Sequence, residues 1–379
     1  MVDLTRPSLE ERIRQMIAAT GPMSLADYMS LCLADPQDGY YTAHRPIGAK
    51  GDFITAPEIS QLFGELIGIW MRAAWQMSGR PTPFHLVELG PGRGTLMNDM
   101  LRVVCQDPEA AAALHIHLVD ISPTLRAEQE ATIAGFQQTK SWHETLDSLP
   151  SAPLFMIGNE FFDCLPIHQW VFSEGRWHER VIGLDERGAL TFGIGPVRAL
   201  SAPSQGRETR TTNGPVPEPG AILEHSPASE AIMAFIAGHL GAHGGAALFF
   251  DYGHAAPGYG DTFQAMSHHA HADPLRAPGR QDLTAHVNFD ALRRTALAEL
   301  AERPAHGLTV PAIMTQGDFL LVMGLLQRAG QLGAGQSPEM QGQLQDAVER
   351  LAGPDHMGKL FKCLALMPAG LPLPPHATA

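Results

Sequence analysis

The stretch that decides the fold reads His85-Leu86-Val87-Glu88-Leu89-Gly90-Pro91-Gly92-Arg93-Gly94-Thr95-Leu96. In it, an apolar run ends near an acidic residue and continues into three closely spaced glycines. Glycine adopts positive φ without strain and lets a ligand approach the backbone closely. Residues 95–104 have helical periodicity, and the N-terminus of a helix favours anionic groups. The stretch therefore predicts a strand, a ligand-binding loop and a helix, in that order.

The same alternation of short apolar runs and helical patterns continues after this stretch. Strand, helix, strand connections in one sheet are right-handed crossovers, and they produce parallel strands. We therefore expect an α/β fold with a Rossmann-like, mostly parallel sheet. The expected strands are residues 84–89, 116–119, 154–158, 246–250 and 360–367, and the expected helices are 95–104, 122–134, 228–240, 288–300, 319–328 and 340–351.

Three regions are expected along the chain. Residues 1–80 are predicted to form an N-terminal helical layer with a lid loop, and residues 81–367 the Rossmann-like domain. Residues 368–379 form a Pro-rich tail. The predicted helices of the first region are 8–19, a short one after Ser24, and 58–77. The second region contains an inserted loop region at about 165–222, with extended segments at 167–172 and 177–182. It also contains a substrate-side region at about 255–345, which includes a polar loop at 268–281.

Composition excludes several classes of protein. Twenty-six basic against 40 acidic residues give a net charge of −14, which disfavours binding to nucleic acid. No apolar stretch approaches the roughly 18 residues that span a bilayer, so membrane insertion is not expected. Charged residues near the start of the chain, such as Arg6 and Glu10, argue against a signal peptide. On these grounds we expect a cytoplasmic protein.

The glycine loop predicts the cofactor. Thr95 stands where the third glycine of the dinucleotide fingerprint G-x-G-x-x-G belongs, so that motif is not matched. The pattern from Glu88 through Gly90, Gly92 and Gly94 is E-x-G-x-G-x-G, which is typical of class I S-adenosylmethionine-dependent methyltransferases. Asp120 ends the next predicted strand, where a carboxylate can accept hydrogen bonds from ribose hydroxyls. These residues are the predicted cofactor site.

A second polar group follows the strand predicted at 154–158. Asn159, Glu160 and Asp163 come directly after it and are expected at the carboxyl edge of the sheet, where open α/β sheets bind ligands. Methyl transfer is an in-line displacement that needs a nucleophile held close to the donor methyl group. Polar side chains at this edge are therefore candidates for holding the acceptor.

Five blocks of the chain are distinctive when they are taken together. They are Gly51-Asp52-Phe53-Ile54-Thr55-Ala56-Pro57-Glu58-Ile59-Ser60-Gln61-Leu62-Phe63-Gly64-Glu65, Glu88 to Leu96, Asn159-Glu160-Phe161-Phe162-Asp163, Asp251-Tyr252-Gly253-His254 and Asp282-Leu283-Thr284-Ala285-His286-Val287. In this order the blocks resemble the MidA family, whose mitochondrial members are complex I assembly methyltransferases. The resemblance implies methylation with S-adenosylmethionine, and for the mitochondrial members the product is a symmetrically dimethylated arginine on a complex I core subunit. Asn288 departs from the family, in which an aspartate is expected.

Arginine chemistry gives the carboxylates a role. A guanidinium stays protonated in proteins, so its nitrogen attacks only if acidic partners orient it and localise its charge. Glu160 and Asp163 are the first candidates. The full predicted site adds Asn159 and His286 to the catalytic residues, Thr55 to the cofactor residues, and Asp52, Glu58, Tyr252 and His254 to the acceptor side. A metal site is not expected at His268, His269, His271 and Asp273, because these donors are consecutive or nearly so in the sequence.

Two other functions remain open at this point. A methyltransferase of the same kind can act on a small molecule instead of a protein. A non-catalytic assembly chaperone can keep the fold and bind a respiratory subunit, although such a protein has no need of the intact loop at Gly90, Gly92 and Gly94. The preferred acceptor is a protein arginine, most plausibly on the quinone-side core subunit of complex I, with S-adenosyl-L-methionine as cofactor.

Overall fold

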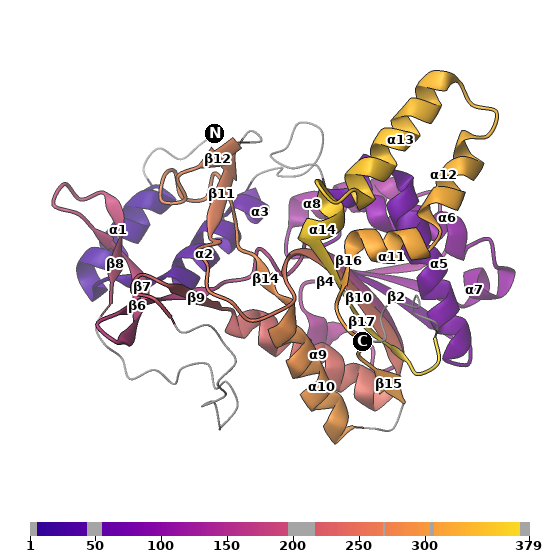
Figure 1. The fold of residues 1–379 in the computed structure, drawn as a ribbon, viewed down its shortest axis with the longest axis horizontal. Coiled ribbons are helices and arrows are strands. Elements are labelled where there is room, and N and C mark those ends of the chain that lie inside the picture. Colours follow the sequence, from indigo (N-terminus) through magenta and orange to yellow (C-terminus); the bar gives the residue numbers. More distant parts are fainter. Residues whose placement is uncertain (1–5, 44–54, 196–216, 268–269, 304–306, 372–379) are drawn as a thin grey trace.

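The computed structural model describes residues 6–43, 55–195, 217–267, 270–303 and 307–371 (Figure 1). Asp52, His268 and His269 therefore lie outside the described residues. Figure 1 shows a twisted sheet with helices on both faces, and beside it a part made of the N-terminal helices and a group of antiparallel strands. Within the described ranges, no helix combines the length and the apolar character that crossing a bilayer requires.

The central sheet carries the fold. Its strand order is β15-β17-β10-β5-β2-β3-β4, and β2, β3, β4, β5 and β10 are parallel. The last long strand, β17, is antiparallel to β10. These pairings confirm the predicted α/β fold with a mostly parallel sheet. The strands are β2 (Phe84–Leu89), β3 (Leu114–Val119), β4 (Thr139–His143), β5 (Leu154–Asn159), β10 (Gly245–His254), β15 (Leu308–Thr309) and β17 (Phe361–Pro368), with short additions from β14 (Val287–Asn288) and β16 (Met314–Thr315).

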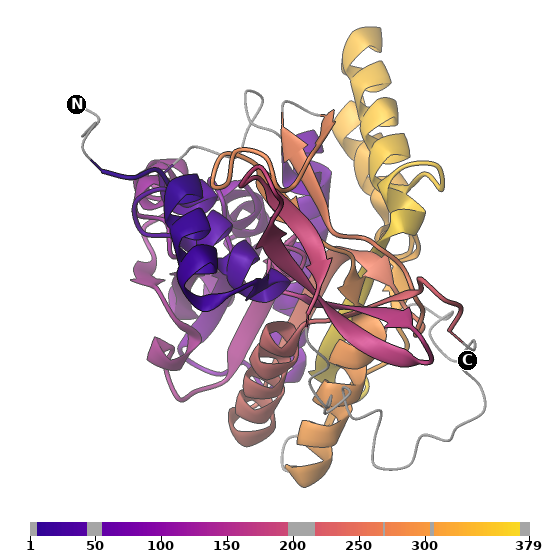
Figure 2. The same cartoon turned by 90° about the vertical axis from the view of Figure 1, so that its left-hand side faces the viewer.

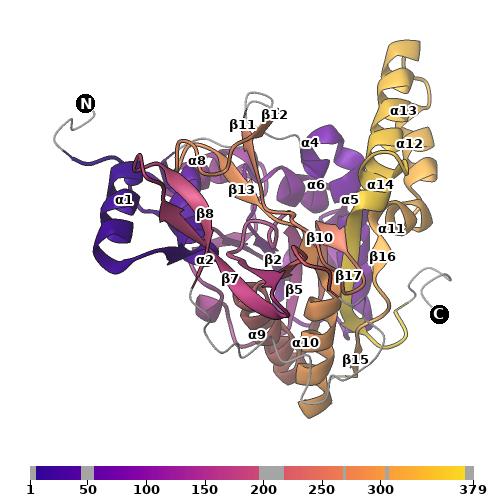
Figure 3. The same cartoon turned by 60° about the vertical axis from the view of Figure 1, so that its left-hand side comes forward.

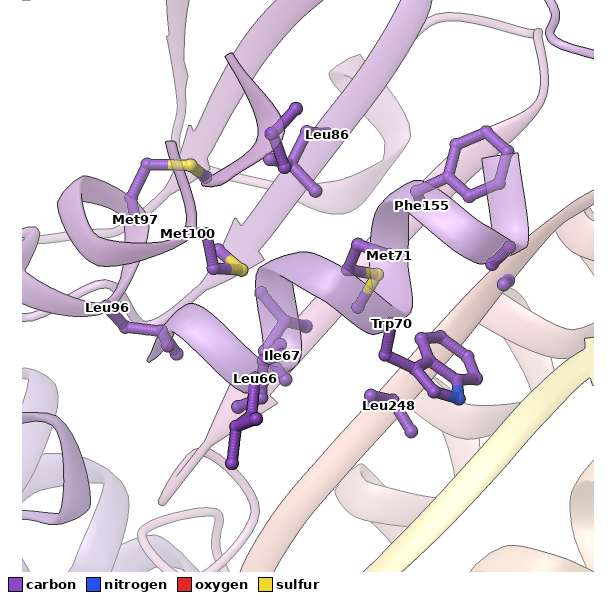
Figure 4. Close-up of a cluster of buried hydrophobic side chains, with 14 of the residues drawn as sticks. Leu66, Ile67, Trp70, Met71, Leu86, Leu96, Met97, Met100, Phe155 and Leu248 are labelled. Atoms are coloured by element: carbon purple, nitrogen blue, oxygen red, sulfur yellow. The ribbon is translucent and has the colours of Figure 1, made fainter. Parts of the chain in front are cut away.

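Helices cover both faces of this sheet because successive strand residues point to opposite sides. Leu86 packs on the side of α5 (Gln61–Met77) and α6 (Thr95–Val104), where Trp70 and Met100 complete the cluster in Figure 4. Val87 packs on the other side, against α9 (Pro227–His243) and α10 (Phe289–Glu302). The sheet is therefore buried on both faces, as its nearly continuous apolar runs require.

The N-terminal helices pack on a second, antiparallel sheet. Helix α1 (Leu9–Thr20) begins with a capping box between Ser8 and Glu11, and α2 (Leu25–Ala34) begins at Ser24. Between them, β1 (Met23–Ser24) pairs with β7, which lies more than a hundred residues later in the chain. Figures 2 and 3 show the N-terminal helices beside the antiparallel strands. The other strands of this part are β6 (His168–Ser173), β7 (Arg176–Leu184), β8 (Leu190–Ile194) and β9 (Ile222–His225), and a three-stranded sheet of β11 (Gln264–Ser267), β12 (Ala270–Ala272) and β13 (Asp282–Thr284) lies nearby in the same hydrophobic cluster.

Two predicted helices are each split in the structure. The helix predicted at 58–77 is α4 (Ala56–Ile59) and α5, separated by Ser60, which is extended and caps α5. The helix predicted at 319–328 is α11 (Gln316–Val322) and α12 (Leu325–Gly333), separated by Gly324 at φ 92°. The other helices are α3 (Tyr40–Ala43), α7 (Pro108–Ala113), α8 (Pro123–Thr132), α13 (Pro338–Ala352) and α14 (Met357–Leu360), with one turn of 3-10 helix at Leu146–Ser148.

Candidate active site

A cavity of about 700 Å³ opens at the carboxyl ends of β2, β3 and β5. Six of the predicted site residues line it: Thr55, Gly90, Gly92, Asp120, Glu160 and Asp163. The N-terminal layer contributes further lining residues, among them Met29, Leu33 and Tyr41. The remaining predicted residues in the described part of the chain do not line this cavity; they are Glu58, Glu88, Gly94, Asn159, Tyr252, His254 and His286.

The glycine loop has the backbone that the sequence predicts. Gly90, Gly92 and Gly94 have φ values of 61°, 51° and 81°. A Cβ atom at Gly90 would lie 3.2 Å from the ring of Phe161, and one at Gly94 would lie 3.3 Å from the backbone of Gln129. Both the left-handed conformation and the close neighbours favour glycine at these positions. The main chain of Gly90 and Gly92 can therefore approach a ligand in the cavity.

Gln129 joins the glycine loop to Asp120, and the sequence analysis missed it. Its Nε2 donates to the carbonyl of Gly92 over 2.9 Å and to Oδ2 of Asp120 over 2.8 Å. Its Oε1 accepts from Trp142 Nε1 over 3.0 Å, which fixes the orientation of the amide. Asp120 also accepts from the N–H of Ser122. Because each carboxylate oxygen has two lone pairs, Asp120 can accept further hydrogen bonds from the hydroxyls of a ligand.

Glu88 lies beneath the loop, buried in the sheet. Burial raises the pKa of its carboxyl well above the ordinary value, while the N–H of Met97 lowers it. Its Oε2 has no hydrogen-bond partner among the described residues. A buried polar atom without a partner is rare and costly in native proteins. An unpaired polar atom beneath a glycine loop fits a ligand that brings a polar group to that loop, such as the amino group of a methionine moiety, although Glu88 itself does not line the cavity.

Glu160 stands at the end of β5 with φ 52°, an uncommon conformation for a residue with a side chain. Its N–H donates to the carbonyl of Phe250, and its Oε1 accepts from Asn159 Nδ2 over 3.1 Å. Burial, together with the nearby Asp163, raises the pKa of Glu160 to about 8. Strain at such a position is typical of functional sites.

Asp163 and Asp251 form a buried pair behind Glu160. Asp251 Oδ2 accepts from the N–H groups of Phe162 and Asp163 over 2.9 and 3.2 Å. Burial has the larger effect on Asp163 and raises the pKa of its carboxyl to about 6. The nearby Tyr252 hydroxyl opposes this rise, although it makes no hydrogen bond of good geometry. Asp251 was part of a quoted block but not of the predicted site. Its role in the structure is to shape the turn that carries the two candidate acids.

Tyr41 brings the N-terminal layer into contact with Asp282, another acid of the cavity. Its hydroxyl donates to Oδ1 of Asp282 over 2.8 Å, and both residues line the cavity. Neither residue was assigned to the site from the sequence, because their positions are 241 residues apart. The cavity is therefore built from the sheet edge, the N-terminal layer and the segment around β13.

The two predicted histidines lie elsewhere. His254 and His286 line a separate cavity of about 40 Å³, which is large enough for only a few water molecules. The ring of His286 contacts Tyr252 at 5.4 Å between centroids, and burial lowers its pKa. Within the described ranges, no group of three His, Cys, Asp or Glu side chains could hold a metal ion.

These features define a class of protein. A parallel sheet with a glycine loop after its first strand, a carboxylate after the second and acids after the fourth is the site of an S-adenosylmethionine-dependent methyltransferase. The family described as "Putative S-adenosyl-L-methionine-dependent methyltransferase" matches residues 66–306. The chain belongs to this family.

Named relatives and solved structures agree with this assignment. The chain is 37% identical to the mitochondrial protein arginine methyltransferase NDUFAF7 homolog of Drosophila melanogaster, over 96% of this chain and 86% of the relative. It is 36% identical to the mitochondrial NDUFAF7 of Homo sapiens, over 93% and 81%. A protein from Burkholderia thailandensis, solved with S-adenosyl-homocysteine bound, superposes with a TM-score of 0.78 at 27% identity and covers 95% of this chain and 91% of that one. S-adenosylmethionine is therefore the cofactor.

The relatives also correct one expectation. The sequence analysis places the protein in the cytoplasm, and this prediction is wrong, since the relatives are named as mitochondrial proteins. The prediction rested on charged residues near the start of the chain. Such a composition does not by itself fix the compartment in which a protein works.

Asp120 supplies the first testable prediction. Asp120→Ala is expected to weaken the binding of S-adenosylhomocysteine by about 1 to 3 kcal/mol, because it removes acceptors for ligand hydroxyls and leaves Gln129 with one partner fewer. Isothermal calorimetry measures the change. The matched control is Asp147→Ala, which removes an exposed acid from the same cavity and should leave the affinity unchanged. Equal affinities for both variants would remove Asp120 from the cofactor site.

Proposed function

We propose that this protein transfers methyl groups from S-adenosylmethionine to an arginine side chain of a partner protein. One observation carries the choice of acceptor. Among the described residues, those that line the cavity include the buried acids Glu160 and Asp163 but no lysine, arginine or histidine, so a cationic acceptor that enters the cavity can pair with these two acids. Buried carboxylates without a basic partner are costly, and a guanidinium matches them in charge and in planar geometry. The names of the relatives support the same acceptor.

The chain's own residues would divide the work between two sides of the cavity. On the cofactor side, the loop at Gly90 and Gly92 and the carboxylate of Asp120 would bind the cofactor, which supplies a methyl group on a sulfonium. On the acceptor side, Glu160 and Asp163 would accept hydrogen bonds from the guanidinium and localise its charge on the nitrogen that is not attacked.

Proton balance assigns a further role to Glu160. The acceptor is a cation and the methylated product is also a cation, so each transfer of a methyl cation releases one proton from the guanidinium. A guanidinium bound beside Glu160 would lower the raised pKa of this carboxyl and keep it ionised. The carboxylate could then take up the released proton, because its site favours the protonated form more than the site of an ordinary carboxylate does. Asn159 would hold the carboxylate in place through Oε1.

The partner that we propose is the quinone-side core subunit of complex I, which rests on the family resemblance. The test is mass spectrometry of that subunit from cells with and without the gene. We expect an arginine that carries methyl groups only when the gene is present. Wild type should restore the mark and Glu160→Gln should not. Identical arginine masses in both cell lines would refute this partner, and labelling of small molecules alone by the purified protein would refute a protein acceptor.

A further inference from the structure

A single helical turn, α4, lies over the junction between the two halves of the site. Thr55 precedes it in an extended conformation and lines the cavity, whereas Ala56 and Pro57 are buried. Ser60 interrupts the helix after Ile59, so α4 is not a rigid extension of α5. Figure 3 shows α4 next to the beginning of α6, where the glycine loop ends. The turn is therefore placed to contact the cofactor loop and the acceptor side together.

Glu58 attaches this turn to the glycine loop. Its Oε1 accepts a hydrogen bond from Thr95 Oγ1 over 2.8 Å, and Thr95 directly follows Gly94. Its Oε2 lies 3.7 Å from Arg93 Nη1, and Arg93 also approaches Glu128 at 3.4 Å. The Glu58 side chain is 19% exposed, so the contact with the Thr95 hydroxyl is largely shielded from water. The sequence assigned Glu58 to the acceptor, but its carboxylate is engaged by the cofactor loop.

The opposite end of the same turn lies near Glu160, the acid proposed to hold the methyl acceptor. The N–H of Ala56 lies near the Glu160 carboxylate and lowers the pKa of that group against the effect of burial, and Thr55 and Glu160 line the same cavity. Ala56 and Glu58 are separated by one residue in a single turn. A displacement of the glycine loop therefore moves the N–H that faces Glu160.

We propose that Glu58 is a positioning residue that couples the cofactor loop to Glu160 through α4. When the cofactor orders the loop, Thr95 and Arg93 hold Glu58, α4 is fixed, and Ala56 keeps Glu160 turned toward the acceptor. Coupling between two ligand sites is reciprocal, so the acceptor should also strengthen the binding of the cofactor through the same contacts. The role of Glu160 in this inference rests on the proposed function, whereas the link from the loop to α4 does not.

Hydrogen exchange of the α4 amides tests the link without any acceptor. In the wild-type protein, saturating S-adenosylhomocysteine should slow the exchange of the amides of Glu58 and Ile59, which donate to the carbonyl of Thr55, by about tenfold or more, because local opening then requires release of the loop. In Glu58→Ala and in the isosteric Thr95→Val, the ligand should still bind but should no longer slow this exchange. The control is Glu109→Gln. Glu109 lies on α7 and forms an exposed ion pair with Arg80, so this variant should show the same slowing of exchange as wild type.

The pH profile tests the second half of the coupling. Loss of the Ala56 N–H from Glu160 raises the pKa of that carboxyl, so the apparent pKa of kcat/KM in Glu58→Ala should rise by about half a unit or more. The inference would be overturned if S-adenosylhomocysteine slowed the exchange of the α4 amides in Glu58→Ala as much as it does in wild type. If exchange behaves as expected but no arginine is methylated by wild type, the proposed function fails and the link between the loop and α4 stands.

Discussion

Glu160→Gln is expected to lower kcat by about a hundredfold or more while the affinity for S-adenosylhomocysteine stays close to that of wild type. Glutamine keeps the shape of the side chain and its contact with Asn159, but it removes the charge that holds a guanidinium and the site that accepts its proton. The interaction lost is therefore one that is strongest in the transition state. Steady-state kinetics and calorimetry measure the two quantities separately.

Glu144→Gln is the matched control for this change. Glu144 lines the same cavity but is exposed to solvent, so the same chemical substitution there should alter kcat little. A Glu160→Gln enzyme with normal turnover and weakened cofactor binding would move Glu160 from the acceptor side to the cofactor side.

The same variant has a second expected property, which depends on pH. The pKa of Glu160 is about 8 in the folded protein and about 4.5 when the chain is unfolded. Between these values the unfolded chain releases a proton that the folded chain keeps, so the free energy of unfolding falls as the pH rises. Glutamine does not titrate. Glu160→Gln should therefore gain thermal stability relative to wild type between pH 5 and pH 8, and a constant difference over this range would contradict the burial of this acid.

Gly92→Val is expected to abolish cofactor binding, with an affinity reduced by about a hundredfold or more. Gly92 lines the cavity at φ 51°, a conformation that a β-branched side chain strongly disfavours. The carbonyl of Gly92 also accepts from Gln129, so a change in this backbone disturbs Asp120 through the shared amide. Calorimetry with S-adenosylhomocysteine measures the loss.

The control for Gly92→Val must carry the same backbone strain at another place. Gly175 has φ 73° in the turn between β6 and β7, and nothing lies within 4 Å of the position of its Cβ. Gly175→Val should cost stability in a thermal melt but leave the affinity unchanged. A folded Gly92→Val protein with normal affinity would contradict the assignment of the loop.

Local patterns predicted one half of the site well. Gly90, Gly92 and Asp120 follow directly from the ends of two strands, and parallel strands place such residues at one edge of a sheet. Glu160 and Asp163 were found by the same rule. These five residues line one cavity, as the periodicity of the sequence predicts.

The other half depends on contacts between distant segments, which periodicity does not report. The carboxylate of Asp251 accepts a hydrogen bond from the N–H of Phe162, 89 positions away in the sequence, and Tyr41 donates one to Asp282, 241 positions away. Gln129 lies on a helix whose pattern shows only that one of its faces is buried. Glu58 was assigned to the acceptor side together with Asp52, as an acid of the N-terminal loop, and only the fold shows that its carboxylate accepts a hydrogen bond from Thr95.

The pairing of the N-terminal layer with late segments has a consequence for synthesis on the ribosome. The apolar faces of α1 and α2 share one cluster with Ile182, Phe263 and Leu283, and the hydroxyl of Tyr28 donates to the carbonyl of Pro274. During synthesis, helices α1 and α2 therefore lack these packing partners until some 240 further residues have been translated. The cavity for methyl transfer includes Asp282, so a nascent chain that ends before this residue has no complete site.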